Sequence, residues 1–269
     1  MKNISVIIPT YNREKTIRRS IDSVLKQDGQ GEFFNIMEII IVDDCSNDNT
    51  ETAVKAIDDL RIKYIRNKKN HGAGGARNIG ARFAKENWIA FHDSDDVWVP
   101  EKLKLQVQYL ENHPDVEMVC GSTKTHIAGK GTAIMTIDEE HNNVKSLATR
   151  NFVAAPTIMI KRETFLNIGG FDEDLKALED WDLGLRYAAE KKIGFINSVL
   201  IEVELLEGGV SSHPGNYFDS RCRMIVKNKD ILVKHDCLQT AMERLFIMAE
   251  EAGVLKETGM ILEQYLLHL

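Results

Sequence analysis

The residues best able to do chemistry stand together in one stretch, where Asp93, Asp95 and Asp96 place three carboxylates within four positions. They follow the apolar run 88–91 and precede Pro100, a residue favoured at the first position of a helix. Carboxylates this close repel one another unless a cation lies among them. A hard divalent ion such as Mg²⁺ or Mn²⁺, shared with a diphosphate, would relieve that repulsion. The alternative is a solvated turn in which one aspartate caps the next helix.

The elements that must position this cluster follow from the spacing of apolar residues. Predicted strands lie at residues 4–8, where Pro9 ends the run, and at 38–42, 62–65 and 88–91. Predicted helices follow them at about 17–25, 53–60, 76–86 and 100–112. Four strand–helix units in series predict an α/β fold, with a mainly parallel central sheet flanked by helices and right-handed crossovers.

Further polar clusters stand where the predicted strands end. They are the group Pro9, Thr10, Tyr11 and Asn12, the pair Asp43 and Asp44, and the glycine turn at 71–75. Ligands of parallel sheets bind outside the carboxyl ends of the strands. We therefore expect these clusters to line one rim together with the carboxylates at 93–96. For Tyr11 and Asn12, a turn with a helix cap is the alternative.

The regular alternation weakens after a further predicted strand at 116–121. Residues 122–150 are polar and turn-rich, which predicts a variable loop over the sheet edge. Strand character returns at 151–160, and a helix beginning near Glu179 carries acidic residues in its first turn, as the helix dipole favours. A final strand pair is predicted within 193–206, and helices with apolar stripes fill the remainder.

Taken together, the motifs resemble inverting family 2 glycosyltransferases with the glycosyltransferase-A fold, of the bacterial polysaccharide-synthesis type. The resemblance covers about residues 4–212 and rests on five stretches in order: SVIIPTYNRE, IIIVDDCSND, GGARNIG, DSDD and EDWDL. It implies transfer of a sugar from a nucleotide diphosphate donor, with UDP favoured, to an acceptor hydroxyl. On this basis we expect a catalytic domain at 1–215, with a nucleotide-sugar half at 1–121 and an acceptor half at 122–215, and a C-terminal helical extension at 216–269.

The resemblance also implies a role for each nucleotide-binding residue. Asp44 would accept a hydrogen bond from uracil N3–H, with Asp43 beside it. Residues 9–12 would contact base and ribose, and Tyr11 would offer an apolar face. Arg77 would place a fixed cation near a base carbonyl or a phosphate. Without the surrounding motif, Arg77 would be interpreted as a surface arginine on a helix.

The aspartate cluster corresponds to the metal site of the family. Asp95 and Asp96 would reach metal, diphosphate and ribose, with Asp93 assisting, and the Mg²⁺ or Mn²⁺ cofactor would neutralise the leaving nucleoside diphosphate. His213 follows a segment that lies near the phosphates in some relatives, so metal or phosphate contact and a structural role are its alternatives. Before that segment the sequence departs from the family, because EVELL stands at 202–206 where relatives often carry Arg and His.

An inverting displacement needs a base on the face opposite the leaving group, and the resemblance assigns that base to Asp180. One base suffices, because the acceptor itself is the nucleophile. The acceptor is expected to be a saccharide or a lipid-linked saccharide, with Glu179 and Trp181 beside it. Glu179 either orients the site or complements the helix dipole, and Trp181 either stacks on an acceptor sugar or fills the core.

Composition excludes several classes of protein. The chain of 269 residues has 34 Lys and Arg against 41 Asp and Glu, a net charge of −7, which disfavours a nucleic-acid partner. No apolar stretch approaches the roughly 18–20 residues of a transmembrane segment. The widely spaced cysteines, Cys45, Cys120, Cys222 and Cys237, indicate reduced structural thiols. We expect a cytoplasmic location, free or peripheral at the inner face of the membrane, and C-terminal helices that pack on the domain, dimerise or lie on that face.

Other functions fit the sequence less well. A dinucleotide-binding fingerprint should follow the first strand, whereas the glycine turn at 71–75 follows the third. A sugar nucleotidyltransferase should carry a glycine-rich loop with a lysine where IPTYN stands. A catalytically inactive module that binds a nucleotide or a partner is the remaining alternative. The joint presence of Asp44, Asp95, Asp96 and Asp180 argues against it.

Overall fold

The computed structural model of the chain describes residues 1–127, 129, 131–136, 142–205 and 214–267. Its N-terminal part alternates strands and helices as the sequence predicts. These elements are β1 (Lys2–Thr10), α1 (Ile17–Leu25), β2 (Phe34–Asp43), α2 (Thr50–Lys55), β3 (Ile62–Arg66), α3 (Gly72–Phe83) and β4 (Trp88–Phe91).

The second part mixes short and long elements. Up to the middle of the chain they are β5 (Val97–Trp98), α4 (Lys102–Asn112), β6 (Met118–Ile127), β7 (Gly131–Met135), α5 (Val144–Leu147), a 3₁₀ turn (Ala155–Thr157) and β8 (Met159–Lys161). The rest are α6 (Arg162–Asn167), α7 (Glu179–Ala188), β9 (Gly194–Leu205), α8 (Pro214–Lys227), α9 (Lys229–Lys234), α10 (Leu238–Glu251) and α11 (Leu255–Leu267).

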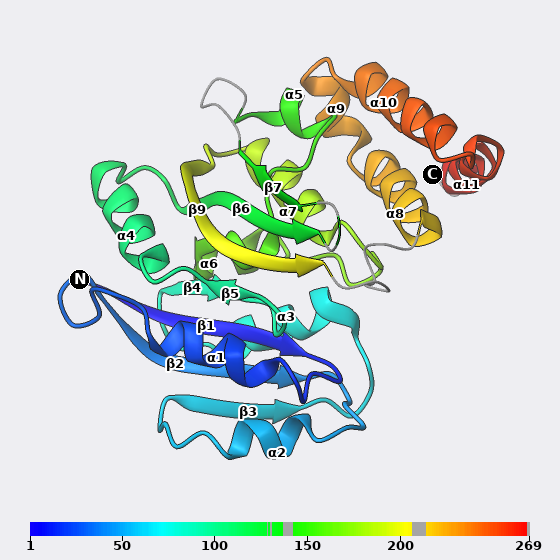
Figure 1. Cartoon of the computed structure of the whole chain (residues 1–269). Coiled ribbons are helices and arrows are strands. Elements are labelled where there is room, and N and C mark those ends of the chain that lie inside the picture. The colour runs from blue at the N-terminus through cyan, green and yellow to red at the C-terminus, as the bar shows by residue number, and fades with distance from the viewer. Residues whose placement is uncertain (128, 130, 137–141, 206–213, 268–269) are drawn as a thin grey trace.

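Within the described residues the strands form one nine-stranded sheet in the order β3-β2-β1-β4-β8-β6-β9-β5, with β7 paired to β6. Strands β1 to β4 pair in parallel, as does β6 with β9, while β8 joins the two groups through antiparallel pairs. Figure 1 shows β1, β2 and β3 in one half of the molecule and the C-terminal helices beyond the half that holds β6 and β9. The predicted α/β fold is confirmed.

Strand β1 is buried on both faces, as expected for the middle of a parallel sheet. Ile4, Val6 and Ile8 belong to a buried cluster that includes α1 and α4. Ile7 belongs to the cluster on the other face, which α3 covers. Gly80 permits this packing, because a Cβ at that position would clash with the Ile7 side chain. Helices therefore cover both faces of the sheet at β1.

Several predicted boundaries are wrong. The loop predicted at 122–150 contains the end of β6, strand β7 and helix α5, because the polar residues of β6 pair with β7 and β9 along its full length. The strand pair predicted within 193–206 is the single strand β9, and strand structure in 151–160 begins only at Met159. Helix α2 ends at Lys55, so Leu60, predicted to lie on its apolar face, is fully exposed.

The C-terminal helices share a buried core with the α3 face of the sheet. Their buried residues include Phe218, Cys222, Met224, Leu245 and Leu262. Packing on the domain, the default prediction for this tail, is confirmed. No helix among the described residues combines the length and apolar character needed to cross a bilayer.

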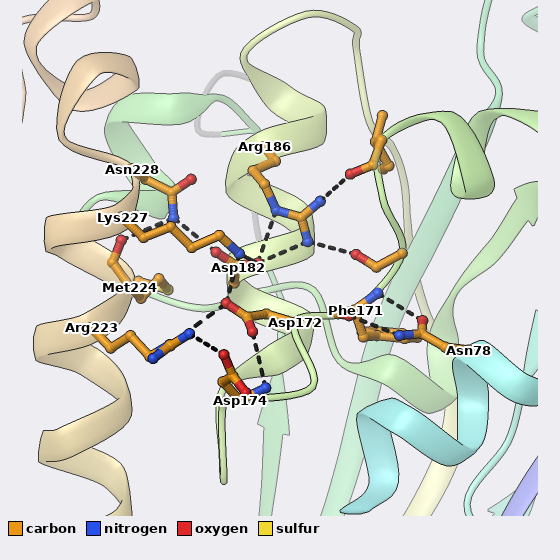
Figure 2. A network of polar contacts seen from close by, with 12 residues as sticks. Asn78, Phe171, Asp172, Asp174, Asp182, Arg186, Arg223, Met224, Lys227 and Asn228 are labelled. Atoms are coloured by element: carbon orange, nitrogen blue, oxygen red, sulfur yellow. Dashed lines mark hydrogen bonds and ion pairs between the residues drawn. The ribbon is translucent and has the colours of Figure 1, made fainter. Parts of the chain in front are cut away.

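A buried carboxylate ties helix α7 to α8. Asp182 is fully buried, and its oxygens accept hydrogen bonds from Arg186 Nε at 2.9 Å, Lys227 Nζ at 3.0 Å and Asn228 Nδ2 at 2.8 Å. Figure 2 shows these side chains converging on Asp182 between the two helices. The C-terminal helices are thus joined through charge and hydrogen bonds to the helix that begins at Glu179.

Removal of this carboxylate should destabilise the whole domain. We expect Asp182→Ala to lower the free energy of unfolding by about 3 kcal/mol, because it leaves Arg186 and Lys227 without their buried partner. Asp174→Ala is the matched control, since that side chain is 73% exposed and pairs with Arg223 at the surface. It should cost less than about 1 kcal/mol. Urea unfolding measures both values, and equal losses would contradict the buried role of Asp182.

Candidate functional site

The carboxyl ends of β1, β2 and β4 meet at one edge of the sheet, as predicted. Asp44 N donates to Thr10 O at 2.8 Å, and His92 N donates to Ile7 O at 3.0 Å. Across the loops that follow, Asn12 N donates to Ser46 Oγ at 2.8 Å. Figure 1 shows the arrowheads of β1, β2 and β3 pointing to the same side of the molecule. The predicted clusters therefore form one rim.

Within the 9–12 group, Tyr11 has the side chain most open to a ligand, at 46% exposed. Pro9 and Thr10 are buried inside β1, which continues past the predicted stop because Pro9 and Thr10 pair with Val42 and Asp43. Asn12 has φ of +53°, a conformation that asparagine tolerates better than most residues. Its Oδ1 accepts from Asn47 N at 2.9 Å.

Asp43 is fully buried and engaged by neighbouring residues. Its carboxylate accepts hydrogen bonds from Ser46 N at 2.7 Å and from the Tyr64 hydroxyl, and Arg66 Nη1 lies 3.5 Å away. Burial, followed by the hydrogen bond to Asp43, raises the pKa of Tyr64. These contacts give Asp43 a structural role that the sequence did not indicate.

Asp44 holds the start of helix α3. Its carboxylate accepts from Asn67 Nδ2 at 2.7 Å, His71 N at 2.9 Å and Gly72 N at 2.8 Å. The last two are unpaired N–H groups of a helix terminus, which need an acceptor. The helix therefore begins at Gly72, inside the stretch predicted to be a glycine turn. The preceding Asn67 was not singled out from the sequence.

Arg77 is not a surface residue. It is 4% exposed, and its guanidinium donates to Asp93 Oδ1 at 2.6 Å and to Glu179 Oε1 at 2.7 Å. These two carboxylates raise the pKa of Arg77 although its burial opposes the charge. One cation thus joins the aspartate cluster after β4 to the first turn of α7, the turn that carries Asp180.

Asp95 and Asp96 differ in their partners. Asp95 is partly exposed, and its Oδ2 lies 3.1 Å from Arg13 Nη2. Asp96 is 6% exposed, and its carboxylate has no hydrogen bond or ion pair within the described part of the chain. Burial, with Asp93 and Asp95 nearby, raises the pKa of Asp96 to about 9. Among the described residues, Asp96 is thus a buried acid with no cation in direct contact, although the charges of Arg77 and Arg19 act on it from further away.

Asp180 lies at the start of α7 with both oxygens held. Oδ1 accepts from Trp181 N at 2.7 Å and from Asn151 Nδ2 at 3.1 Å, and Oδ2 accepts from Ala155 N at 3.1 Å. Burial, assisted by the charge of Glu179, raises its pKa to about 7. A carboxylate with a pKa near neutrality is suited to take up a proton in this pH range.

The prediction that Trp181 contacts an acceptor is wrong, because the side chain is 3% exposed. Its Nε1 donates to Leu147 O at 2.6 Å, and the Arg221 guanidinium lies over the ring at 3.9 Å. Trp181 therefore fills the core, the second of its predicted roles. Glu179 is occupied by Arg77, which is consistent with an orienting role.

His213 lies outside the described residues. No group of three or more His, Cys, Asp or Glu side chains is arranged to hold a metal in the ranges that the structure describes. The three aspartates of the cluster thus do not converge, because Asp93 points its carboxylate to Arg77 and Asp95 pairs with Arg13. The structure adds Arg13 and Asn151 to the site. Arg13 stands in the stretch SVIIPTYNRE but was given no role there, and Asn151 belongs to no pattern that marked it in the sequence.

Comparisons with known proteins identify the family of the chain. Residues 5–168 match the family described as Glycosyl transferase family 2. An uncharacterised glycosyltransferase of Haemophilus influenzae is 33% identical over 190 residues, which cover 70% of this chain and 62% of that protein. The Escherichia coli enzyme named UDP-Glc:alpha-D-GlcNAc-diphosphoundecaprenol beta-1,3-glucosyltransferase WfgD is 33% identical over 78% of this chain and 80% of its own length.

Solved structures show the same fold. The fragment 1–349 of S. aureus TarS in complex with UDP-GlcNAc aligns with a TM-score of 0.72 and 25% identity, over 91% of this chain and 73% of that one. The mannosyltransferase PcManGT from Pyrobaculum calidifontis, solved with GDP-Man and Mn²⁺, aligns with a TM-score of 0.64 and 20% identity, over 98% and 79% of the two chains. With more than half of its length matched by the family, the chain belongs to glycosyl transferase family 2 and is a glycosyltransferase.

Proposed function

We propose that the chain transfers a sugar from a UDP-linked donor to a hydroxyl of a lipid-linked saccharide, with inversion, in cell-surface polysaccharide or glycolipid synthesis. The observation that carries this proposal is the double contact of Arg77 with Asp93 and Glu179. It brings the acids suited to a metal and diphosphate next to Asp180, the acid suited to proton transfer. A transfer that uses one base needs its proton acceptor close to the acids that hold the donor, so that the two substrates meet between them.

The relatives support the choice of substrates. WfgD and WfaP of Escherichia coli both carry names that specify UDP-Glc as donor and a diphosphoundecaprenol-linked GlcNAc as acceptor. WfaP is 35% identical over 62% of this chain and 64% of its own length. TarS was solved with UDP-GlcNAc. We place the reaction on the cytoplasmic side of the membrane, where the chain would meet a lipid-linked acceptor as a peripheral protein.

The residues present fit a divalent metal, and the test is the environment of Asp96. Its nearly buried carboxylate lacks a partner among the described residues and lies close enough to Asp93 and Asp95 for their charges to raise its pKa. A dication would supply the missing charge. Asp96 and Asp95 would hold Mg²⁺ or Mn²⁺ together with donor oxygens. When bound, the ion would neutralise charge on the leaving diphosphate.

The nucleotide would lie over the ends of β1 and β2. Three N–H donors engage the Asp44 carboxylate, and His71 N lies 2.9 Å from both of its oxygens. Uracil N3–H would take the place of one of the two His71 contacts, which leaves His71 N its other acceptor. The exposed Tyr11 ring would cover one side of the base. Arg77 would act through Asp93 and Glu179, which it holds in place, because both of its terminal nitrogens already donate to them.

Transfer of the sugar would then need one proton acceptor. Asp180 would take the proton from the acceptor hydroxyl while that oxygen attacks the anomeric carbon and the bond to the diphosphate breaks. Glu179 keeps the first turn of α7 attached to Arg77, and thereby fixes the direction from which the acceptor is approached. The buried Trp181 contributes only by anchoring this turn.

Replacement of the proposed base tests the mechanism. We expect Asp180→Asn to lower turnover by about 10²–10⁴-fold, the usual contribution of a positioned general base. The wild-type rate should rise with pH through about 7, where the Asp180 carboxyl loses its proton. UDP release from UDP-glucose measures the rate, and calorimetry should show unchanged UDP binding. A variant with near wild-type turnover would refute the assignment.

The metal site gives a second test through stability. The folded pKa of Asp96, about 9, lies above its ordinary value of 3.8, so the folded state retains a proton that the unfolded chain releases. The contribution of Asp96 to wild-type stability should therefore fall as pH rises from about 4 to 9, and Asp96→Asn lacks this loss. The melting temperature of the variant should exceed that of the wild type increasingly over this range. Mn²⁺ with UDP should stabilise the wild type more than the variant.

The opposite results would exclude the metal assignment. An unchanged difference in melting temperature between pH 4 and 9 would mean that Asp96 does not titrate as a buried acid. Full activity in excess chelator would mean that no dication takes part in transfer.

A screen of nucleoside diphosphates with Mn²⁺ tests the donor. UDP should give the largest thermal shift, since a ligand at 100 times its Kd adds about 2.7 kcal/mol to the folded state. Asp44→Asn keeps an oxygen for N3–H and should lose less of the shift than Asp44→Ala. Each shift is measured against the ligand-free variant, because Asp44 also holds the start of α3. A larger shift with GDP, or tight UDP binding without turnover, would favour another donor or an inactive module.

A further inference from the structure

The side chain of Asn151 is fixed in one orientation. Its Oδ1 accepts from Val153 N at 2.9 Å, and its Nδ2 donates to Asp180 Oδ1 at 3.1 Å. A backbone N–H can only donate, so the amide oxygen must face Val153. The NH₂ group is thereby turned to Asp180, because the reversed amide would set two donors against each other at Val153 N and two acceptors against each other at Asp180 Oδ1.

The donors around Asp180 are unevenly distributed between its oxygens. Oδ1 accepts two hydrogen bonds, from Asn151 and from Trp181 N, whereas Oδ2 accepts one, from Ala155 N. Each carboxylate oxygen has two lone pairs. Within the described residues, Oδ2 is therefore the oxygen with a lone pair left for an incoming proton.

The segment that carries these donors is locked to helix α7. At Gly184 a Cβ would lie 2.8 Å from Val153 Cγ2, so glycine lets the segment lie directly against the helix. On the other side of Asn151, Trp181 Nε1 donates to Leu147 O at 2.6 Å, and Arg221 donates to Ala148 O while it stacks on Trp181. Asn151 is thus held on both sides by contacts with α7 and α8.

The charged groups facing Asp180 come from several elements. Burial, and then Glu179 on its own helix, raise the pKa of Asp180, while Arg77 from α3 and the N–H groups of Ala155 and Trp181 lower it. From β6, Cys120 interacts with Asp180, but burial raises the pKa of that thiol to about 12 and keeps it neutral. A donating amide at position 151 also favours the charged carboxylate.

We propose that Asn151 is a positioning residue for transfer: its amide fixes the Asp180 carboxylate so that Oδ2 is presented to the acceptor hydroxyl. The inference rests on the proposed function, in which Asp180 is the base. Asn151 touches neither substrate in this scheme. Its effect should therefore appear in the protonation and direction of Asp180 rather than in donor affinity.

The pH profile of the reaction tests this role. Asn151→Asp has the same shape but can only accept when ionised, and it places a second carboxylate beside Asp180. We expect the acidic limb of kcat/KM for UDP-glucose, followed by UDP release, to move upward by about one pH unit or more. Turnover at pH 7 should fall at least about tenfold, with recovery at higher pH and an unchanged Kd for UDP. Asn35→Asp, the same change at the opposite end of the sheet, is the matched control and should have no effect.

A stability measurement tests the same point without any substrate. The difference in melting temperature between the wild type and Asp180→Asn, followed against pH, reports the titration of Asp180. The same comparison is then made between Asn151→Ala and the double variant Asn151→Ala with Asp180→Asn. The pH at which half of the melting-temperature difference has developed should be higher than without Asn151→Ala, because the charged Asp180 carboxylate has lost a hydrogen-bond donor.

The outcomes separate the two proposals. If Asp180→Asn abolishes turnover while Asn151→Asp and Asn151→Ala keep the wild-type pH profile and titration midpoint, Asn151 does not position the base and the inference is overturned. If Asp180→Asn retains turnover, the assignment of the base under the proposed function fails instead.

Discussion

The site depends on the buried guanidinium of Arg77, which lies between two carboxylates from distant parts of the chain. Arg77 meets Asp93 after β4 and Glu179 at the start of α7, and removal of either partner would leave buried charge without compensation. The next residue of α3, Asn78, exchanges two hydrogen bonds with the Phe171 backbone, as Figure 2 shows. Helix α3 thereby fixes the position of the loop after β4 relative to the start of α7.

Much of this arrangement could be predicted from the sequence because its determinants are local. Apolar runs and the polar residues that end them place the strands, and parallel strands carry their carboxyl ends to one edge. Strand β4 was predicted with its observed bounds for this reason. The order of the motifs then indicated the family, which is confirmed, while the roles of Asp44, Asp96 and Asp180 in binding and transfer remain predictions.

What the sequence could not supply was the identity of each partner. Asp44 accepts hydrogen bonds from backbone N–H groups 27 and 28 residues further along the chain, at the start of α3. Trp181 packs against Arg221, a residue of α8. Residues 122–127, the outer half of β6, were interpreted as part of a loop because they are polar, and only pairing with β7 and β9 makes them a strand. Contacts of this kind depend on the assembled fold and leave no pattern in neighbouring residues.

The single sheet has a mechanical consequence. Many enzymes with two substrates close around them by a hinge motion between two domains. Here β1, β2 and β3 are hydrogen-bonded through β4 and β8 to β6 and β9, so the N-terminal strands and the later strands belong to one continuous sheet. Bending between the halves would break a ladder of backbone hydrogen bonds and separate Arg77 from one of its acids. We therefore expect any movement that admits or releases a ligand to occur in the connections along the rim, while the sheet beneath them keeps its shape.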